Sequence, residues 1–156
     1  MGNVYMLEKY IELDGIVLKA CCCNWQEAID QGAEPLLKRG VILPAYVDSI
    51  KKNHQELGPY MVIAPGIMLA HARPECGAKG LGLTVLTLEN PIVFGSEMND
   101  PVTLVITLAT PDDMSHLHML EALMDFLMCP ELVAKLIAAD TPAEALDILK
   151  NKRSDL

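Results

Sequence analysis

The sequence is short of positive charge. Its 156 residues include 12 Lys and Arg against 21 Asp and Glu, which gives a net charge of −9 at pH 7. A protein that binds the phosphate backbone of nucleic acid needs a stripe of Lys and Arg to displace counterions, and this sequence has none. We therefore expect no nucleic-acid partner and an acidic surface that suits solubility or docking to a basic protein.

Long apolar runs are also missing. The longest uncharged stretch of the central region, residues 57–70, is interrupted by Pro59 and Pro65. A membrane-spanning helix needs about 20 consecutive apolar residues, so we expect no insertion into a membrane. With 51% apolar and 21% charged residues the chain can still bury a hydrophobic core, and we expect residues 1–156 to form a single domain.

Several sequence motifs are absent as well. The five cysteines are an odd number, three of them are consecutive (residues 21–23), and none belongs to a C-x-x-C pair. Neighbouring cysteines are poorly placed to bond to each other, so we expect reduced thiols in a cytoplasmic protein. The sequence also has no P-loop, no G-x-G-x-x-G and no G-x-S-x-G, so neither a nucleotide or other cofactor nor a serine hydrolase is indicated.

The first third of the chain has the pattern of one strand and two helices. Residues 16–23 are apolar and predict a strand that includes the three cysteines. Asn24 and Glu27 have the spacing of a capping box, which predicts a helix that begins after Asn24 and ends near Gly40. Pro44 opens a second predicted helix, which extends to about residue 55.

Strand patterns dominate the middle, and helices follow. We expect strands at 60–64, 67–70, 81–88 and 102–108, the last two buried on both faces, with loops at 90–91 and 97–101. Helices are expected at 111–128, 130–139 and 142–150, the last capped by Thr141. Helices on both sides of a strand-rich middle indicate an α/β fold in which helices cover a central sheet.

One histidine falls on an apolar helix face. Projected at about 100° per residue, the helix after Asp113 has an apolar stripe that contains His116 and faces the sheet, while His118 lies on the opposite side. The stripe consists of Leu117, Leu120, Leu123, Met124 and Leu127, and Glu121 and Asp125 accompany His118. A core histidine bonded to the backbone is the simpler interpretation of His116, and a functional side chain is the alternative.

A second histidine ends an apolar strand pattern. His71 follows Ile67–Ala70, and Arg73 comes two positions later. A polar ring and a guanidinium at the end of a strand are suited to holding an anion at a rigid sheet edge. A strand-end histidine without a role is the simpler alternative.

Metal binding is the competing explanation of these histidines. His116-x-His118 has the spacing that opens some metallohydrolase motifs, but Met119 and Leu120 follow it and supply no ligands. On a helix, side chains at i and i+2 point about 200° apart, so the two rings cannot share one ion. We therefore expect no metal site.

The run from Ala64 to Pro74, APGIMLAHARP, resembles the phosphorylation-site motif of enzyme IIA domains of the bacterial sugar phosphotransferase system, mannitol/fructose class. Within that class it is most similar to the ascorbate- and galactitol-type members. The segments Asn24–Ala28, Gly58–Tyr60 and Asn99–Val102 add to the resemblance, and so do Ser115–Leu117 with Leu120. The similarity extends from about Cys23 to Lys150.

The resemblance implies a fold, a reaction and partners. The fold is a mixed central β-sheet flanked by α-helices, and the activity is a phosphotransferase that needs neither metal nor cofactor. His71 would accept a phosphoryl group from the carrier protein HPr and pass it to a cysteine of enzyme IIB. The membrane enzyme IIC would then import the sugar, with ascorbate as the favoured substrate. His116 would be the second active-site histidine, and Arg73 would help to stabilise the anion.

The sequence departs from the family pattern at two places. Ala70 stands where proline usually precedes the phosphorylated histidine, and the 53–56 segment replaces an Arg-Glu pair that is common in the preceding helix. A regulatory module that senses phosphorylation without a dedicated transporter is the alternative function. The oligomeric state is left open, a homodimer included.

Overall fold

A computed structural model describes residues 7–150 of the chain. Residues 1–6 and 151–156, which the expected domain includes, lie outside the described part. The strands are β1 (Ile16–Ala20), β2 (Val62–Ala64), β3 (Ile67–Ala70), β4 (Gly82–Ile92) and β5 (Val102–Ala109). The helices are α1 (Trp25–Lys38), α2 (Pro44–Leu57), α3 (Asp113–Leu127), α4 (Pro130–Ala138) and α5 (Pro142–Lys150). Three short 3-10 helices complete the described part: η1 (Leu7–Lys9), η2 (Leu13–Gly15) and η3 (Pro74–Cys76).

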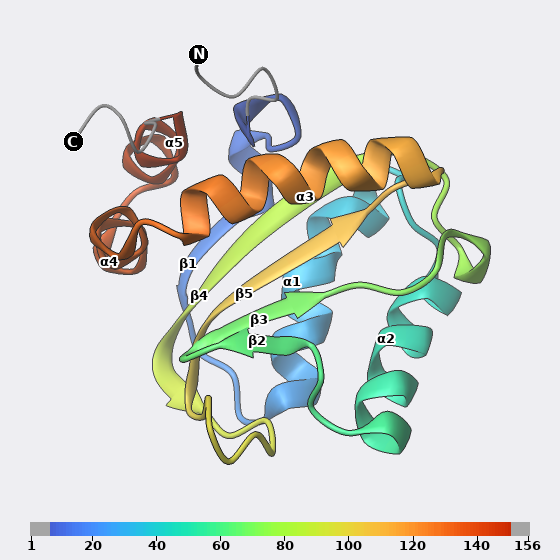
Figure 1. Ribbon diagram of the computed structural model, residues 1–156, viewed down its shortest axis with the longest axis horizontal. Helices are drawn as coiled ribbons and strands as arrows, with labels where there is room; N and C mark the ends of the chain where they lie inside the picture. Colours follow the sequence, from blue (N-terminus) through green and yellow to red (C-terminus); the bar gives the residue numbers. More distant parts are fainter. Residues whose placement is uncertain (1–6, 151–156) are drawn as a thin grey trace.

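The five strands form one mixed sheet in the order β1-β4-β5-β3-β2. Strand β1 is parallel to β4 and β3 is parallel to β5, whereas β4–β5 and β2–β3 are antiparallel pairs. Helices α1 and α2 cover one face of the sheet and α3 crosses the other, with α4 and α5 beside it (Figure 1). The expected α/β fold, a mixed sheet flanked by helices, is confirmed.

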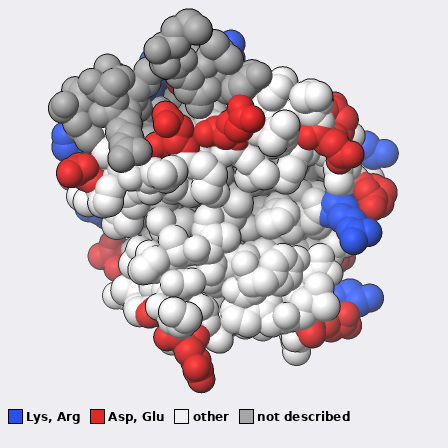
Figure 2. Space-filling model, viewed as in Figure 1, with Lys and Arg blue, Asp and Glu red and all other residues white. Residues whose placement is uncertain are grey.

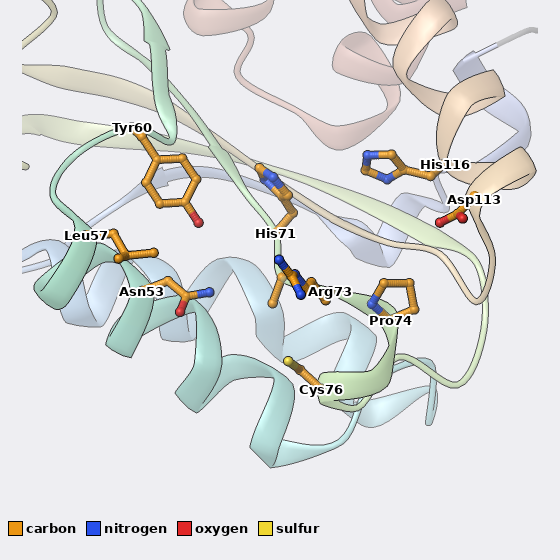
Figure 3. A pocket seen from close by; sticks show the side chains of 10 residues that line it. Asn53, Leu57, Tyr60, His71, Arg73, Pro74, Cys76, Asp113 and His116 are labelled. Carbon is orange, nitrogen blue, oxygen red and sulfur yellow. The ribbon is translucent and has the colours of Figure 1, made fainter.

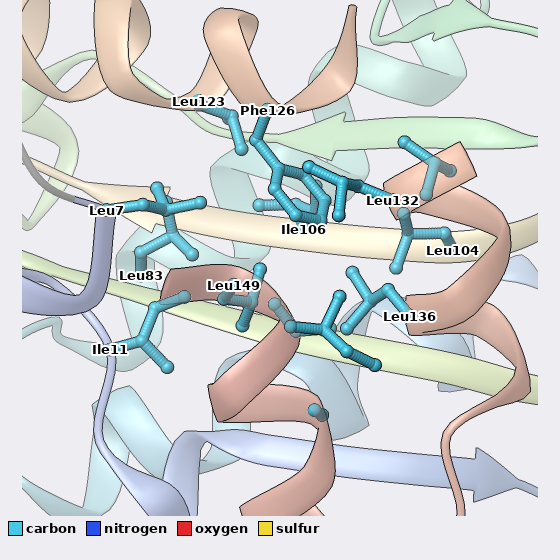
Figure 4. Packing of buried hydrophobic residues seen from close by; sticks show 14 of the residues in the cluster. Leu7, Ile11, Leu83, Leu104, Ile106, Leu123, Phe126, Leu132, Leu136 and Leu149 are labelled. Carbon is cyan, nitrogen blue, oxygen red and sulfur yellow. The ribbon is translucent and has the colours of Figure 1, made fainter. Parts of the chain in front are cut away.

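Two hydrophobic clusters lie on the two faces of the sheet. Along β5, Leu104, Ile106 and Leu108 pack with α3, α4 and α5 in one cluster, which Figure 4 shows. Val105 and Ala109 of the same strand pack with α1 and α2 in the other cluster. Successive side chains of a strand point to opposite faces, so a strand between two helical layers must be apolar on both. This explains the nearly continuous apolar character of β4 and β5.

The capping box of α1 is confirmed. The Asn24 side chain accepts a hydrogen bond from the Glu27 amide at 2.9 Å, and the Glu27 carboxylate accepts one from the Cys23 amide at 2.6 Å. Because residues 21–23 form this approach to the helix, β1 ends at Ala20 and the predicted strand was too long. Cys21 and Cys23 are exposed, so strand packing does not explain them.

The prediction of a loop at residues 90–91 is wrong. Strand β4 continues to Ile92, which pairs with Val102 of β5. The register shifts between Thr87 and Ile92, and the residues between Leu88 and Ile92 are exposed. Proline is tolerated where a strand is irregular, so Pro91 does not end the strand.

The predicted buried face of α3 is only partly correct: Leu123 is buried, and Leu120 and Leu127 pack against the core as partly buried side chains. Met119, Ala122, Leu123 and Phe126 are the buried residues, whereas Leu117 and Met124 are exposed. The helix carries apolar side chains on most of its circumference, so periodicity alone could not select the face that packs. No helix within residues 7–150 is both long enough and apolar enough to cross a membrane.

Candidate functional site

Parallel pairing brings the two candidate histidines to one edge of the sheet. Strands β3 and β5 run parallel, and Ala70, the last residue of β3, pairs with Thr107 near the end of β5. His71 follows β3 directly, and β5 leads within a few residues to α3, which carries His116 one turn from its start. The carboxyl ends of parallel strands share an edge, so residues 45 positions apart in the sequence meet there.

The start of α3 is fixed by its own cap. The Asp112 carboxylate accepts hydrogen bonds from the Ser115 amide at 2.8 Å and from the Ser115 hydroxyl at 3.2 Å. These bonds lower the pKa of Asp112, which keeps the cap ionised over a wider pH range. The first turn, with His116 on it, therefore has a defined orientation at the sheet edge.

The imidazole rings of His71 and His116 face the same opening. Their centroids lie 6.2 Å apart, with an angle of 41° between the planes. The Nδ1 atom of His71 is 2.9 Å from the carbonyl oxygen of Leu69. A carbonyl can only accept, so this bond places the proton on Nδ1 and leaves the lone pair of the neutral ring on Nε2. The backbone thereby selects the tautomer with a nucleophilic Nε2.

A cleft of about 530 Å³ surrounds the two rings. It is lined by residues of α2, of the loop before β2, of the segment after β3 and of the first turn of α3 (Figure 3). The lining residues are Asn53, Leu57, Tyr60, His71, Ala72, Arg73, Pro74, Cys76, Asp113 and His116. All three residues singled out from the sequence, His71, Arg73 and His116, are in this set.

Arg73 supplies the positive charge of the cleft. Its backbone is extended, with φ −68° and ψ 145°, as the following Pro74 favours. The side chain is exposed, and none of the ion pairs found among residues 7–150 includes it. A guanidinium that has no carboxylate partner can bind an incoming anion without first breaking an ion pair.

His116 is less basic than an ordinary histidine. Burial lowers its pKa, the charge of the nearby His71 lowers it further, and the Asp113 carboxylate partly opposes both effects. The imidazole of His116 is therefore mostly neutral at pH 7. An anion bound between the two rings would favour its protonated form, because opposite charges at short range stabilise each other.

The other two histidines do not line the cleft. His54 of α2 is buried, bonds the carbonyl of Phe94 through Nε2 at 2.7 Å and packs against the ring of Trp25. His118 is half-buried on α3, so it is less exposed than the expected surface residue. Among residues 7–150, no group of three or more His, Cys, Asp or Glu side chains is arranged to hold a metal ion.

Sequence reasoning missed part of the cleft. Tyr60 places its ring edge-on to His71, with centroids 6.5 Å apart, and Asn53 and Asp113 line the opening. Tyr60 stands in a segment that resembles the family, but nothing in its spacing assigns it a role. Cys76 lies in the cleft because η3 turns back after Arg73, and no local pattern signals such a return.

The causes of the His116 shift predict opposite effects of two substitutions. His71→Ala should raise the pKa of His116 towards its usual value, because the neighbouring charge is removed. Asp113→Asn should lower that pKa further, because the favourable carboxylate is lost. An NMR titration of the histidine ring protons measures both changes. Shifts of the same sign in the two variants would contradict the assigned causes.

The chain matches a known protein family over most of its length. A model of the family "Phosphoenolpyruvate-dependent sugar phosphotransferase system, EIIA 2" matches residues 9–152. The chain is 35% identical over 139 residues to the ascorbate-specific EIIA component of Escherichia coli K12. The matched segment makes up 88% of this chain and 90% of the relative.

Two solved structures from Escherichia coli have the same fold. The mannitol-specific cryptic enzyme IIA CmtB has a TM-score of 0.85 and 34% identity, over 92% of this chain and 97% of that one. The second structure is the enzyme IIA in a complex of mannitol IIA with phosphorylated IIB. It has a TM-score of 0.77 and 23% identity, over 89% of this chain and 97% of that one. Since the family model covers nearly the whole chain, the protein belongs to the EIIA 2 family of the sugar phosphotransferase system and is a phosphotransferase component that acts through a phosphohistidine.

Proposed function

We propose that His71 carries the phosphoryl group, with Nε2 as the attacking atom. The observation that carries the proposal is the hydrogen bond from His71 Nδ1 to the Leu69 carbonyl, which places the lone pair of the neutral ring on Nε2. A neutral imidazole is a good nucleophile near pH 7, and the phosphoramidate it forms can still pass the group on. His71 also lies at the end of a sheet strand, where its position is rigid.

The two transfer steps balance without any added reactant. In the first, the Nε2 lone pair of His71 attacks phosphorus, and the phosphorus–nitrogen bond of the donor phosphohistidine breaks, returning its electron pair to the donor ring. In the second, a thiolate of the acceptor attacks phosphorus, and Nε2 recovers its electron pair. In both steps the proton would stay on Nδ1, hydrogen-bonded to the Leu69 carbonyl.

Arg73 and His116 are the groups proposed to stabilise the moving charge. Transfer of a phosphoryl group proceeds through a loose transition state, so catalysis consists mainly of positioning and of charge stabilisation on the phosphoryl oxygens. Arg73 provides a permanent charge at the cleft. His116 provides a ring N–H and gains charge when the anion arrives.

The proposed donor is phospho-HPr, and the proposed acceptor is a cysteine of enzyme IIB, which serves a membrane enzyme IIC. The family and the solved complex of the mannitol IIA relative with phosphorylated IIB support this order. We place the relay in the cytoplasm, where the five free cysteines would remain reduced. We also propose that residues 1–156 form a single domain.

Exposed apolar side chains on the rim of the cleft support successive docking of two partners. The side chains of Leu57, Tyr60, Met114 and Leu117 beside the cleft are at least half exposed. Charged side chains lie mainly at the margins of the face that α3 and β2 cross, and its centre is uncharged (Figure 2). Donor and acceptor would use this rim in turn, because the phosphoryl group enters and leaves through one opening.

The first test removes the acceptor. Incubated with phosphoenolpyruvate, enzyme I and HPr, the protein should become labelled with phosphate, and His71→Ala should abolish the label because no nucleophile remains. His118→Ala is the matched control, since it removes a histidine of α3 outside the cleft. Label that persists in His71→Ala would refute the assignment.

The second test removes the cleft charge. Arg73→Gln should lower the initial labelling rate by a factor on the order of 10 to 100. This is less than the roughly 100- to 1,000-fold loss typical of an oxyanion-hole donor, because Arg73 is exposed and water screens its charge. Arg73→Lys should recover part of the rate, because it keeps the charge and loses only the planar pair of donors. Equal rates for Arg73→Gln and the unmodified protein would exclude this role.

The favoured sugar is L-ascorbate, which the name of the 35% identical relative supports. In an Escherichia coli strain that lacks its ascorbate-specific EIIA component, expression of this chain should restore growth on L-ascorbate. The His71→Ala chain, expressed to the same level, is the control. If growth returns on mannitol in a strain without mannitol IIA, and not on ascorbate, the proposed substrate is wrong.

A further inference from the structure

One buried hydroxyl lies directly behind the cleft. Tyr46, in the first turn of α2, is 1% exposed. Its hydroxyl accepts a hydrogen bond from the Ala72 amide at 3.1 Å and donates to the carbonyl oxygen of Leu108 at 2.8 Å. The carbonyl oxygen of Ala72, at 3.2 Å, is a second and more distant acceptor of the same proton. Burial raises the pKa of Tyr46 to about 12, so the hydroxyl keeps its proton and remains a donor at any pH at which the protein works.

The two bonds of this hydroxyl end on the two segments that form the site. Ala72 is the residue between His71 and Arg73, so the first bond holds the backbone that carries both side chains. Leu108 lies near the end of β5, the strand that leads to α3 and His116. Tyr46 is thus a direct bridge, through a single oxygen atom, between the segments of the two histidines.

The segment after β3 also packs against the same turn of α2. The Leu43 amide donates to the carbonyl of Gly77 at 2.9 Å. A Cβ atom placed on Gly77 would lie only 3.2 Å from the Tyr46 nitrogen, so the chain passes very close to the helix start. Residues 72 and 77 are therefore both held by the beginning of α2, and the cleft residues between them have little freedom to move.

We infer that Tyr46 is a positioning residue for phosphoryl transfer, which fixes the separation of His71 and His116 by joining the Ala72 amide to the Leu108 carbonyl. The inference rests on the proposed role of His71. Tyr46 does not line the cleft and is not a catalytic residue. It would act only through the backbone of the segments that carry His71 and His116.

The test compares two substitutions that each remove one buried hydroxyl. Tyr46→Phe keeps the ring and deletes both bonds. Thr84→Val is the matched control, because the Thr84 hydroxyl is also 1% exposed and donates to a backbone carbonyl, that of Gly32, on the α1 side of the sheet. Denaturant midpoints of both variants show how far each is destabilised.

Two readouts separate positioning from general destabilisation. Tyr46→Phe should label about tenfold more slowly from phospho-HPr than Thr84→Val does, since small displacements of reacting groups are costly. The pKa of His116, which faces His71 and Asp113 in the cleft, should rise in Tyr46→Phe alone, because separation from His71 and added exposure both favour the charged ring. Equal labelling rates with equal His116 titrations in the two variants would overturn the inference.

A measurement on the unmodified protein does not require the variant to fold. The Ala72 amide lies outside any helix or strand, but it should exchange with deuterium slowly, because it donates to a buried hydroxyl. Exchange as fast as in an exposed loop would overturn the inference. If the unmodified protein is not labelled at all, the proposed function fails, whereas the titration and the amide exchange still test whether Tyr46 sets the geometry.

Discussion

The parallel pairing of β3 with β5 is the constraint on which the site depends. It places the carboxyl ends of both strands at one edge of the sheet, where His71 follows the first and α3 follows the second. An antiparallel pair would put the two ends at opposite edges. The two helical layers that bury both faces of β4 and β5 make this edge rigid, and so the distance between the two rings is a property of the whole fold.

The chemistry of the cleft then follows from a few polar contacts. The Leu69 carbonyl selects the tautomer of His71, and burial with the neighbouring ring lowers the pKa of His116. Arg73 adds a positive charge, and it takes part in none of the ion pairs found within residues 7–150. In the proposed transfer, one ring would act as the nucleophile and the other would respond to an anion by gaining a proton.

Much of this could be predicted from the sequence, for identifiable reasons. The cap at Asn24 is a local signal, and it is confirmed. The strands expected at 60–64 and 67–70 are local signals too, and they form the antiparallel pair β2–β3. The buried face of α3 could be predicted only in part, because a helix that is apolar on most sides shows its packing only in the folded chain. The same holds for the cleft: the motif indicated His71 and Arg73, but Asn53 and Cys76 enter it through the packing of α2 and η3, which no short pattern encodes.

A carrier must release the group as readily as it accepts it, and this limits how strongly its site should bind phosphate. A deep pocket with several buried cations would stabilise the phosphorylated state and slow the second transfer. Here the permanent charge is a single exposed arginine, and water screens it. The helix α2 contributes the neutral amide of Asn53, and the lowered pKa of His116 favours its neutral form in the empty cleft. A weakly cationic cleft with a fixed geometry therefore suits a relay better than a strongly basic one, because positioning accelerates both transfers whereas strong binding favours only the first.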